Sequence, residues 1–401
     1  MSHVSQLKSF MHRALTYNAH QGVFSHFPSR IEMVVYSALA VLRWKIFRLI
    51  SVVTMGKLGG CSYLGSGVIR DIGEKMANIA VRSRVESQIK IDGAYVQHYD
   101  FAASFPPFFR LKRAFGDCFV YLLSDVVIAP AHGTMWFSDG RLLQESVISI
   151  PHFYSFGGVF ETLLPAVKLQ SEAPLAPLSF HNCYYHQIFE GLLPALRVLH
   201  LFPNVKFLVP FSRPTYFDVM SRFFGIGTDR FIESSCPVCA KHGLLVTRRH
   251  ESGYVRQADV DFLKFEIEKH IDSTNSGRKI YISRSKTGAR RIKNEIDFEN
   301  ALSTLGFDIC HFEVLPFDEQ MKTIHSASIV IAPHGSGEAN MIAARKGTKW
   351  IELLQEGWFE LCYARLALQL GLNYSYFELE SDGSNFSIPI NTIVTALEKG
   401  E

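Results

Sequence analysis

The pattern of apolar and polar positions divides the chain into three stretches. Residues 1–90 have mainly helical spacing of apolar positions, broken by a glycine-rich stretch between residues 56 and 67. From about residue 90 to 150 the apolar runs are short, and the Ser-Asp-Gly sequence at 138–140 is typical of a hairpin turn. From about residue 175 onward, strand-like and helix-like runs alternate. The sequence therefore predicts a helical beginning followed by α/β structure.

The clearest alternation covers residues 279–353. Short apolar runs predict strands at 279–282, 307–310, 328–332 and 349–353. Helical spacing between them predicts helices at 295–305, 317–325 and 338–344. This order predicts a parallel sheet with helices on both faces, and such sheets bind ligands beyond the carboxyl ends of their strands.

A chain of 401 residues fits two domains of ordinary size. Upstream of the clear series, helices are expected at 184–200, 215–224 and 259–270, with strands at 205–209 and 244–247. Four segments follow from this pattern: a helical, basic extension (1–90), an N-terminal domain (91–240), a C-terminal Rossmann-like domain (241–380) and a tail helix (381–401).

The bulk composition excludes several classes of protein. With 47% hydrophobic and 20% charged residues, the chain is globular, and a net charge of +3 gives no support to nucleic-acid binding. Seven cysteines, an odd number, favour a reducing compartment over a disulfide framework. No signal peptide is evident in the first 30 residues.

Positive charge is concentrated near the beginning of the chain. Between residues 31 and 57, Arg43, Lys45 and Arg48 interrupt an apolar run that also contains Trp44. The charges make this run a poor transmembrane span. Two interpretations stay open: an amphipathic helix on an anionic membrane surface, or a packed helix with a basic outer face.

Two segments that follow predicted strands have the chemistry of a phosphate site. The first is basic, and guanidinium and hydroxyl groups suit phosphate oxygens; its candidate residues are Arg284, Ser285, Lys286 and Arg290. The second is glycine-rich and opens a predicted helix, whose N-terminal N–H groups attract anions. Its candidate residues are His334, Gly335, Ser336, Gly337, Glu338 and Asn340. Together they predict a pyrophosphate cradle, although the second segment is not the G-x-G-x-x-G of dinucleotide-binding proteins.

The order of these motifs resembles glycosyltransferase family 61. The resemblance rests on Tyr-Ile-Ser-Arg-Ser-Lys at 281–286, Ala-Pro-His-Gly-Ser-Gly-Glu-Ala-Asn at 332–340 and Trp-Ile-Glu-Leu at 350–353. It extends back to Asn-Cys-Tyr-Tyr-His at 182–186 and covers about residues 125–380. Secretory members of the family carry signal or anchor segments, and none is evident here, so the resemblance implies a bacterial enzyme of the capsule or lipopolysaccharide type.

The resemblance implies a GT-B fold, with two Rossmann-like domains facing across a cleft. It also implies inverting transfer from a nucleotide sugar, with no cofactor and no essential metal. One departure concerns Glu338, where the family usually has an aliphatic residue. A carboxylate at a helix N-terminus would compete with phosphate for the same N–H groups, which indicates a shifted nucleotide or an unusual donor.

Inverting transfer needs a base near the acceptor hydroxyl. His186 and Glu190 are spaced i, i+4 on a predicted helix, so they share one face and are the candidate catalytic residues. The Asp-Val-Asp sequence at 259–261 spells a metal-binding motif, but it opens a predicted helix, where aspartate is a routine residue.

The sequence therefore predicts a transferase that moves a sugar from a nucleotide sugar to a glycan or lipid-linked acceptor in surface polysaccharide synthesis. Its expected location is the cytoplasm or the inner face of a bacterial membrane. Two rival hypotheses remain. One is a non-catalytic nucleotide- or glycan-binding module on the same fold. The other is a Rossmann oxidoreductase, which the absence of G-x-G-x-x-G argues against.

Overall fold

The structure is a computed structural model in which most of the chain after residue 83 is described. The described residues are 68–69, 84–102, 104–106, 109, 111–138, 142–146, 166–169, 171–178, 183–211, 213, 215–247, 253–271, 277–286, 292–355, 360–382 and 385–399. Most of the predicted helical extension, including residues 31–57, lies outside them. Where this N-terminal region is described, its backbone includes two strands: β1 is Val68–Ile69 and β2 is Val85–Asp92. The helical prediction is wrong for β2, because burial there alternates with the two-residue period of a strand.

The first sheet has ten strands of mixed direction. Their main order is β1-β7-β6-β5-β12-β9-β10-β11, with β2 paired to β5 and β8 paired to β12. The bounds not yet given are β5 Cys118–Ile128, β6 Met135–Phe137, β7 Leu142–Leu143, β8 Val167–Lys168, β9 Leu175–Pro177, β10 Lys206–Pro210, β11 Phe231–Ser234 and β12 Val238–Val246. The β9, β10 and β11 strands run parallel to one another. By contrast, β2, β6 and β12 each pair antiparallel with β5.

This sheet departs from the all-parallel sheet that a Rossmann-like domain predicts. The turn between β5 and β6 contains Gly133 at φ 65°, and so short a turn can join only antiparallel neighbours. The long β5–β12 ladder runs from Val238 paired with Ile128 to Val246 paired with Val120. The expected boundary at residue 240 falls inside β12, so the sheet includes residues on both sides of it.

The second sheet matches the predicted βαβ series. Its order is β14-β13-β15-β16-β17-β18, parallel except for the last pair. The strands are β13 Arg278–Ile282, β14 Phe307–Cys310, β15 Ala327–Pro333, β16 Lys349–Gln355, β17 Asn373–Asp382 and β18 Asn385–Ser387. The chain adds β14 on one side of β13 and β15 on the other, which makes the carboxyl ends of β13 and β15 the switch point where open α/β sheets bind ligands.

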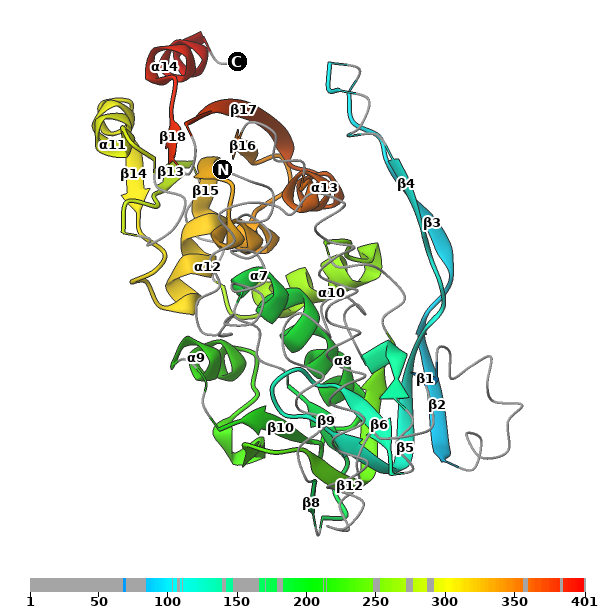
Figure 1. The fold of residues 1–401 in the computed structure, drawn as a ribbon. Helices are drawn as coiled ribbons and strands as arrows, with labels where there is room; N and C mark the ends of the chain where they lie inside the picture. The colour runs from blue at the N-terminus through cyan, green and yellow to red at the C-terminus, as the bar shows by residue number, and fades with distance from the viewer. Residues whose placement is uncertain are drawn as a thin grey trace, which may run out of the picture.

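Helices cover this second sheet (Figure 1). They are α11 Glu295–Thr304, α12 Phe317–Ser326, α13 Cys362–Gln369 and α14 Ile390–Lys399, and α10 (Gln257–Glu268) lies toward the first sheet. Two predictions differ in detail. The helix expected at 338–344 is a 3₁₀ helix, Ser336–Ala343, in which the Glu338 N–H bonds three residues back to Gly335. The tail expected to be helical from 381 begins instead with the end of β17, and β18 and then α14 follow.

The two sheets are joined by packed side chains. One hydrophobic cluster contains buried residues from both, and Phe223 of α9 (Thr215–Phe223) meets Phe317 of α12 with ring centroids 5.1 Å apart. Tyr185 and Tyr363 make a second contact, at 5.7 Å. Packing of this kind fixes the two halves of the molecule relative to each other.

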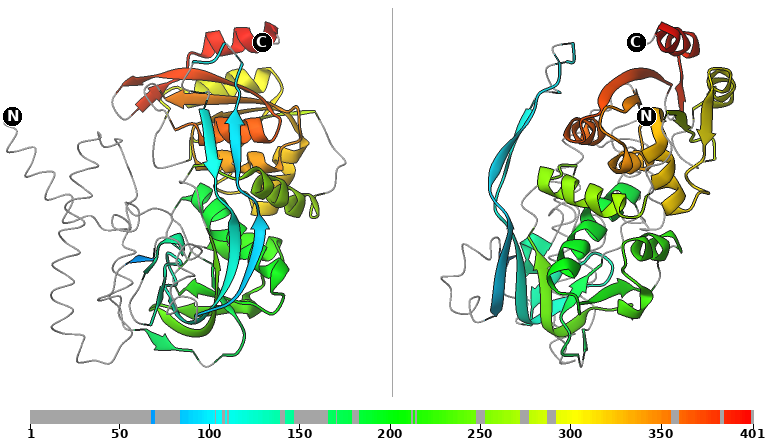
Figure 2. Two further views of the ribbon diagram at one scale, coloured as in Figure 1. Left: turned by 90° about the vertical axis from the view of Figure 1, so that its right-hand side faces the viewer. Right: turned by 180° about the vertical axis from the view of Figure 1, so that it is seen from behind.

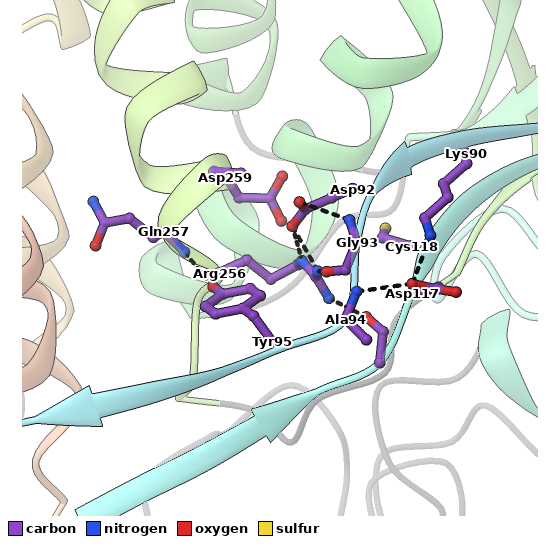
Figure 3. Close-up of polar contacts among 12 residues, drawn as sticks. Lys90, Asp92, Gly93, Ala94, Tyr95, Asp117, Cys118, Arg256, Gln257 and Asp259 are labelled. Carbon is purple, nitrogen blue, oxygen red and sulfur yellow. Dashed lines mark hydrogen bonds and ion pairs between the residues drawn. The ribbon is translucent and has the colours of Figure 1, made fainter.

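A two-stranded ribbon, which we call the arm, also connects the halves. It consists of β3 (Tyr95–Tyr99) and β4 (Leu111–Phe115), and it leaves the first sheet and runs along the second half of the molecule (Figures 1 and 2). At its base the buried Arg256 donates to Asp92 Oδ2, the Gly93 carbonyl and the Gly116 carbonyl, each at 2.6 Å (Figure 3). The Arg256 guanidinium also lies over the stacked rings of Tyr95 and Phe115.

Candidate functional site

The helix that carries the predicted catalytic pair is interrupted by a wider turn. It begins as α7 (Tyr184–His186), continues as a π-helical turn (Gln187–Leu192) and ends as α8 (Leu193–Leu201). Pro194 has no N–H to donate to the carbonyl of Glu190 four residues earlier, and the Leu193 N–H bonds five residues back to Ile188. Such π turns are frequent at functional sites, and this one contains Glu190.

His186 and Glu190 lie together, as their spacing predicts. His186 Nδ1 is 2.9 Å from Glu190 Oε2. The Glu190 side chain is 5% exposed and that of His186 is 28% exposed. A histidine bonded to a buried carboxylate can orient it and exchange a proton with it, which is the arrangement of a general base and its partner.

A small cavity lies between α8, β12 and α10, with Glu190 in its lining. Tyr185, Arg197, Tyr254, Arg256 and Asp259 line it as well. Two of its charges are already paired, because Arg197 Nε and Nη2 donate to Asp259 Oδ1 at 3.0 and 2.9 Å. Asp259 therefore has a structural role in the first turn of α10.

The basic segment follows β13 and rests on α11. The Arg284 N–H donates to Glu295 Oε1 at 2.6 Å, and the Ser283 hydroxyl donates to Glu299 Oε1 at 2.5 Å. Ser285 Oγ lies 2.9 Å from Ser283 Oγ, and Lys286 is exposed. Burial raises the pKa of Glu295. Arg290, the fourth predicted donor-binding residue here, lies outside the described residues.

The glycine-rich segment follows β15, the strand next to β13. The carboxyl ends of adjacent parallel strands meet at one edge, so the structure brings residues 283–286 and 334–337 to the same edge of the sheet. Ser336 and Gly337 are partly exposed, and no heavy atom lies within 4 Å of where a Gly337 Cβ would be. This open space allows a ligand to approach the backbone.

Two predicted donor-binding residues of this segment face the protein interior. Asn340 is fully buried, accepts from the Tyr184 hydroxyl at 2.7 Å and donates to Gln320 Oε1 at 2.8 Å. Glu338 is 1% exposed and accepts from Trp350 Nε1 at 2.9 Å. Burial, and then the neighbouring Glu352, raises the pKa of Glu338 well above its ordinary value. The Glu338 carboxyl group faces inward, but its Oε2 atom also accepts from the Gly335 N–H at 3.4 Å. One backbone N–H of the segment is therefore occupied by Glu338 itself, and an unusual donor stays a prediction.

His334 belongs to a buried polar network that the sequence analysis missed. Its Nδ1 atom is 2.5 Å from Glu352 Oε1, and the Tyr374 hydroxyl donates to Glu352 Oε2 at 2.6 Å. The signal for Glu352 is present in the sequence, since it is a charged residue in the middle of the apolar run of β16. Tyr374 has no comparable signal.

His334, Glu338 and Glu352 have the composition of a cation site. Their ligand atoms lie within 4.8 Å of one another, and all three side chains are buried. Each carboxylate oxygen, however, already has a protein donor: Trp350 Nε1 and the Gly335 N–H for Glu338, and His334 and Tyr374 for Glu352. The network is therefore satisfied by hydrogen bonds among its own residues.

The catalytic pair and the glycine-rich segment are linked through aromatic rings. Tyr185, beside His186, meets Tyr363 with centroids 5.7 Å apart, and Tyr363 meets His334 at 5.2 Å. Tyr185 also lines the cavity next to Glu190. Tyr185 and Tyr363 thus connect the lining of the cavity to His334 at the edge of the second sheet.

A comparison with protein families now bears on this geometry. The profile of the family described as Glycosyltransferase 61 matches residues 184–351. This match supports the assignment of the chain to glycosyltransferase family 61. The matched segment includes the His186–Glu190 pair and both loops at the edge of the second sheet. Family 61 implies glycosyltransferase activity in general, with a sugar donor and an acceptor.

Two further comparisons are brief. No curated protein sequence matches the chain. Within the parts of the chain that the structure describes, none of the helices has the length and apolar character that a membrane span requires.

Proposed function

We propose that the protein transfers a sugar from a nucleotide-sugar donor to a hydroxyl group of a glycan or lipid-linked acceptor, with inversion and without an essential metal. The observation that carries the proposal is the position of the buried Glu190, bonded to His186, on a helix that contacts the glycine-rich segment through Tyr184 and Asn340. The donor lies at the edge formed by residues 283–286 and 334–337, and the acceptor enters from the cavity side.

In this mechanism the Glu190 carboxylate accepts the proton of the acceptor hydroxyl. The acceptor oxygen attacks the anomeric carbon of the sugar, and the bond from that carbon to the nucleotide phosphate breaks. The phosphate leaves with the electron pair, and its charge is stabilised by Arg284, Lys286 and backbone N–H groups near Ser336 and Gly337. His186 orients the Glu190 carboxylate through their hydrogen bond.

The proposed context is surface polysaccharide synthesis on the cytoplasmic side of a bacterial membrane. The basic stretch 31–57 supports attachment to anionic lipid, since it combines Arg43, Lys45 and Arg48 with Trp44. The same residues suit a packed helix, so vesicle binding is the experiment that distinguishes these interpretations.

A thermal-shift screen over nucleotide sugars, followed by transfer assays, tests the proposal. We expect one nucleotide class to raise the melting temperature, because a ligand that binds only the folded state stabilises it. Release of nucleotide from that donor in the presence of an acceptor should follow. Binding without any hydrolysis or transfer would favour a non-catalytic module, and binding of nicotinamide or flavin cofactors alone would favour an oxidoreductase.

A further inference from the structure

Glu352 connects the glycine-rich segment to β17, the strand next to β16 in the second sheet. It is fully buried in β16, with one carboxylate oxygen on His334 Nδ1 and the other on the Tyr374 hydroxyl of β17. A buried carboxylate that holds two donors cannot rotate without leaving polar atoms unsatisfied. The His334 ring is therefore held with Nδ1 toward the sheet, and any contact with a ligand is made through Nε2.

The arm packs on the outer end of this network. The Phe105 ring is stacked on Tyr374 with centroids 6.1 Å apart, and Phe101 meets Tyr374 edge-on at 6.3 Å. Phe109 stacks on Tyr376, two residues further along β17, at 5.3 Å. The tip of the arm, which we define by Phe101, Phe105 and Phe109, thus packs on the rings of Tyr374 and Tyr376, while the hydroxyl of Tyr374 bonds to Glu352.

The arm is fixed at both ends. At its base the buried Arg256 holds Asp92 and two backbone carbonyls (Figure 3), and the Gln257 N–H donates to the Tyr95 hydroxyl at 2.8 Å. At its tip the phenylalanines share a cluster with Leu354, which follows Glu352 by two residues in β16. A ribbon restrained in this way defines the position of Tyr374 more narrowly than β17 alone would.

We propose that Tyr374 and Glu352 are positioning residues. They hold the His334 imidazole, and with it the Gly335–Gly337 backbone, in the geometry that receives the donor phosphate. The arm tip in turn holds Tyr374 in place. The part concerning the donor rests on the proposed function. The restraint on His334 does not, because it involves only residues of the chain itself.

The titratable groups around His334 come from every element packed against it. They are Glu338 of the 3₁₀ helix, Glu352 of β16, Cys362 and Tyr363 of α13, and Tyr374 of β17. Only Glu352 is bonded to the His334 ring among the contacts described above, so the orientation of the His334 ring should respond most to changes that act on Glu352.

Tyr374→Phe is the decisive variant, because it keeps the ring that packs on Phe105 and removes only the hydroxyl. Tyr376→Phe is the matched control, since its ring packs on Phe109 in the same strand. The primary measurement is the ¹⁵N–¹H spectrum of histidine-labelled protein, with the His334 signal assigned from His334→Gln. We expect Tyr374→Phe to shift the ring signals of His334, which report its hydrogen bond to Glu352, and Tyr376→Phe to leave them unchanged.

The second measurement is affinity for uridine, guanosine, adenosine and cytidine diphosphates by calorimetry. For the diphosphate that binds the parent protein, Tyr374→Phe should weaken binding about tenfold, because the less restrained His334 and its loop must then be ordered when the ligand binds. Phe105→Ala should act in the same direction, whereas Phe265→Ala, at an exposed position of α10, should not.

The outcomes distinguish the restraint on His334 from its connection to donor binding. An unchanged His334 signal in Tyr374→Phe, or an equal change in Tyr376→Phe, overturns the positioning role. A changed His334 signal with unaltered diphosphate affinity overturns the connection to the donor loop. If the parent protein binds none of the diphosphates, the proposed donor site fails, while the spectra still decide whether Tyr374 and Glu352 position His334.

Discussion

The Tyr184 hydroxyl donates to Asn340 Oδ1 at 2.7 Å, and this bond joins the helix of the catalytic pair to the glycine-rich segment. Tyr184→Phe should lower the free energy of unfolding by about 1–3 kcal/mol, because Asn340 is buried and would lose a donor. Urea unfolding measures the change. Tyr216→Phe, on a partly exposed ring that contacts Tyr184, is the control and should have little effect. Equal stability of the two variants would show that the bond contributes little.

Glu190→Gln should abolish sugar transfer while leaving folding and nucleotide binding nearly intact. Glutamine keeps the size of the side chain but cannot accept the proton, so the turnover should fall by roughly 10²–10⁴. Glu266→Gln, at another buried glutamate, controls for general effects. His186→Ala distinguishes the two members of the pair, since a larger loss there would make His186 the base. Near-normal turnover in both variants would place the base elsewhere, with His334 the next residue to test.

Arg284→Ala should weaken nucleoside diphosphate binding by about 1.5–3 kcal/mol, the usual cost of a lost charge-assisted contact. The backbone bond from Arg284 to Glu295 does not depend on the side chain, so the loop should keep its shape. Arg278→Ala is a matched control at the other end of β13, where Arg278 pairs with Asp308. Calorimetry that gives the same affinity for Arg284→Ala and the parent protein would exclude Arg284 from the donor site.

Glu338 should make stability depend on pH. Because burial raises its folded-state pKa well above the ordinary 4.5, the folded protein holds this proton more tightly than the unfolded chain does. The resulting stabilisation is complete below about pH 4.5 and is lost as the pH rises toward the folded-state pKa. In Glu338→Gln an amide replaces the carboxyl group, so this proton is no longer bound and released with pH. The melting temperature of this variant relative to the parent should therefore rise with pH across that window. A constant difference for Glu338→Gln would contradict the prediction.

Purified full-length protein should bind anionic vesicles through residues 31–57, and less so as salt increases, because screening shortens the reach of surface charge. Co-sedimentation with phosphatidylserine vesicles and with neutral phosphatidylcholine vesicles measures this. Replacing Arg43, Lys45 and Arg48 with glutamine should remove the difference between the two lipids. Equal binding to both lipids by the parent protein, or none, would favour ordinary packing of the segment.

Four strands of the second sheet, β13 to β16, could be predicted from the sequence, whereas β17 and β18 were not. In the first sheet, the predicted strands at 205–209 and 244–247 correspond to β10 and to the end of β12. Residues 328–332 form a continuous apolar run, and β15 is found at Ala327–Pro333. Runs of this kind mark a buried parallel strand whatever the rest of the chain does. In β3 and β4 partly buried and exposed residues alternate, and only the last residue of each strand is buried. The partners of the arm on β17 are distant in sequence, so the local pattern gave no sign of it.

In the candidate site, the sequence predicted some of the side-chain contacts and missed others. Spacing alone brought His186 and Glu190 together, because i and i+4 positions meet on any helix. The side-chain directions of Glu338 and Asn340 depend on the partners Trp350 and Tyr184, which approach only when the sheets and helices are assembled. Glu352 was visible as a charge within an apolar strand, but its bond to His334 required the register of β15 against β16.

The arm has a consequence for the order in which the protein can be made. Phe105 and Phe109 are synthesised early, yet the tyrosines on which they pack lie in β17, close to the end of the chain. Their apolar rings therefore lack their partners until nearly the whole polypeptide has left the ribosome. Contacts between such distant residues form slowly, so the arm is the part of the molecule most exposed to aggregation or chaperone capture during synthesis.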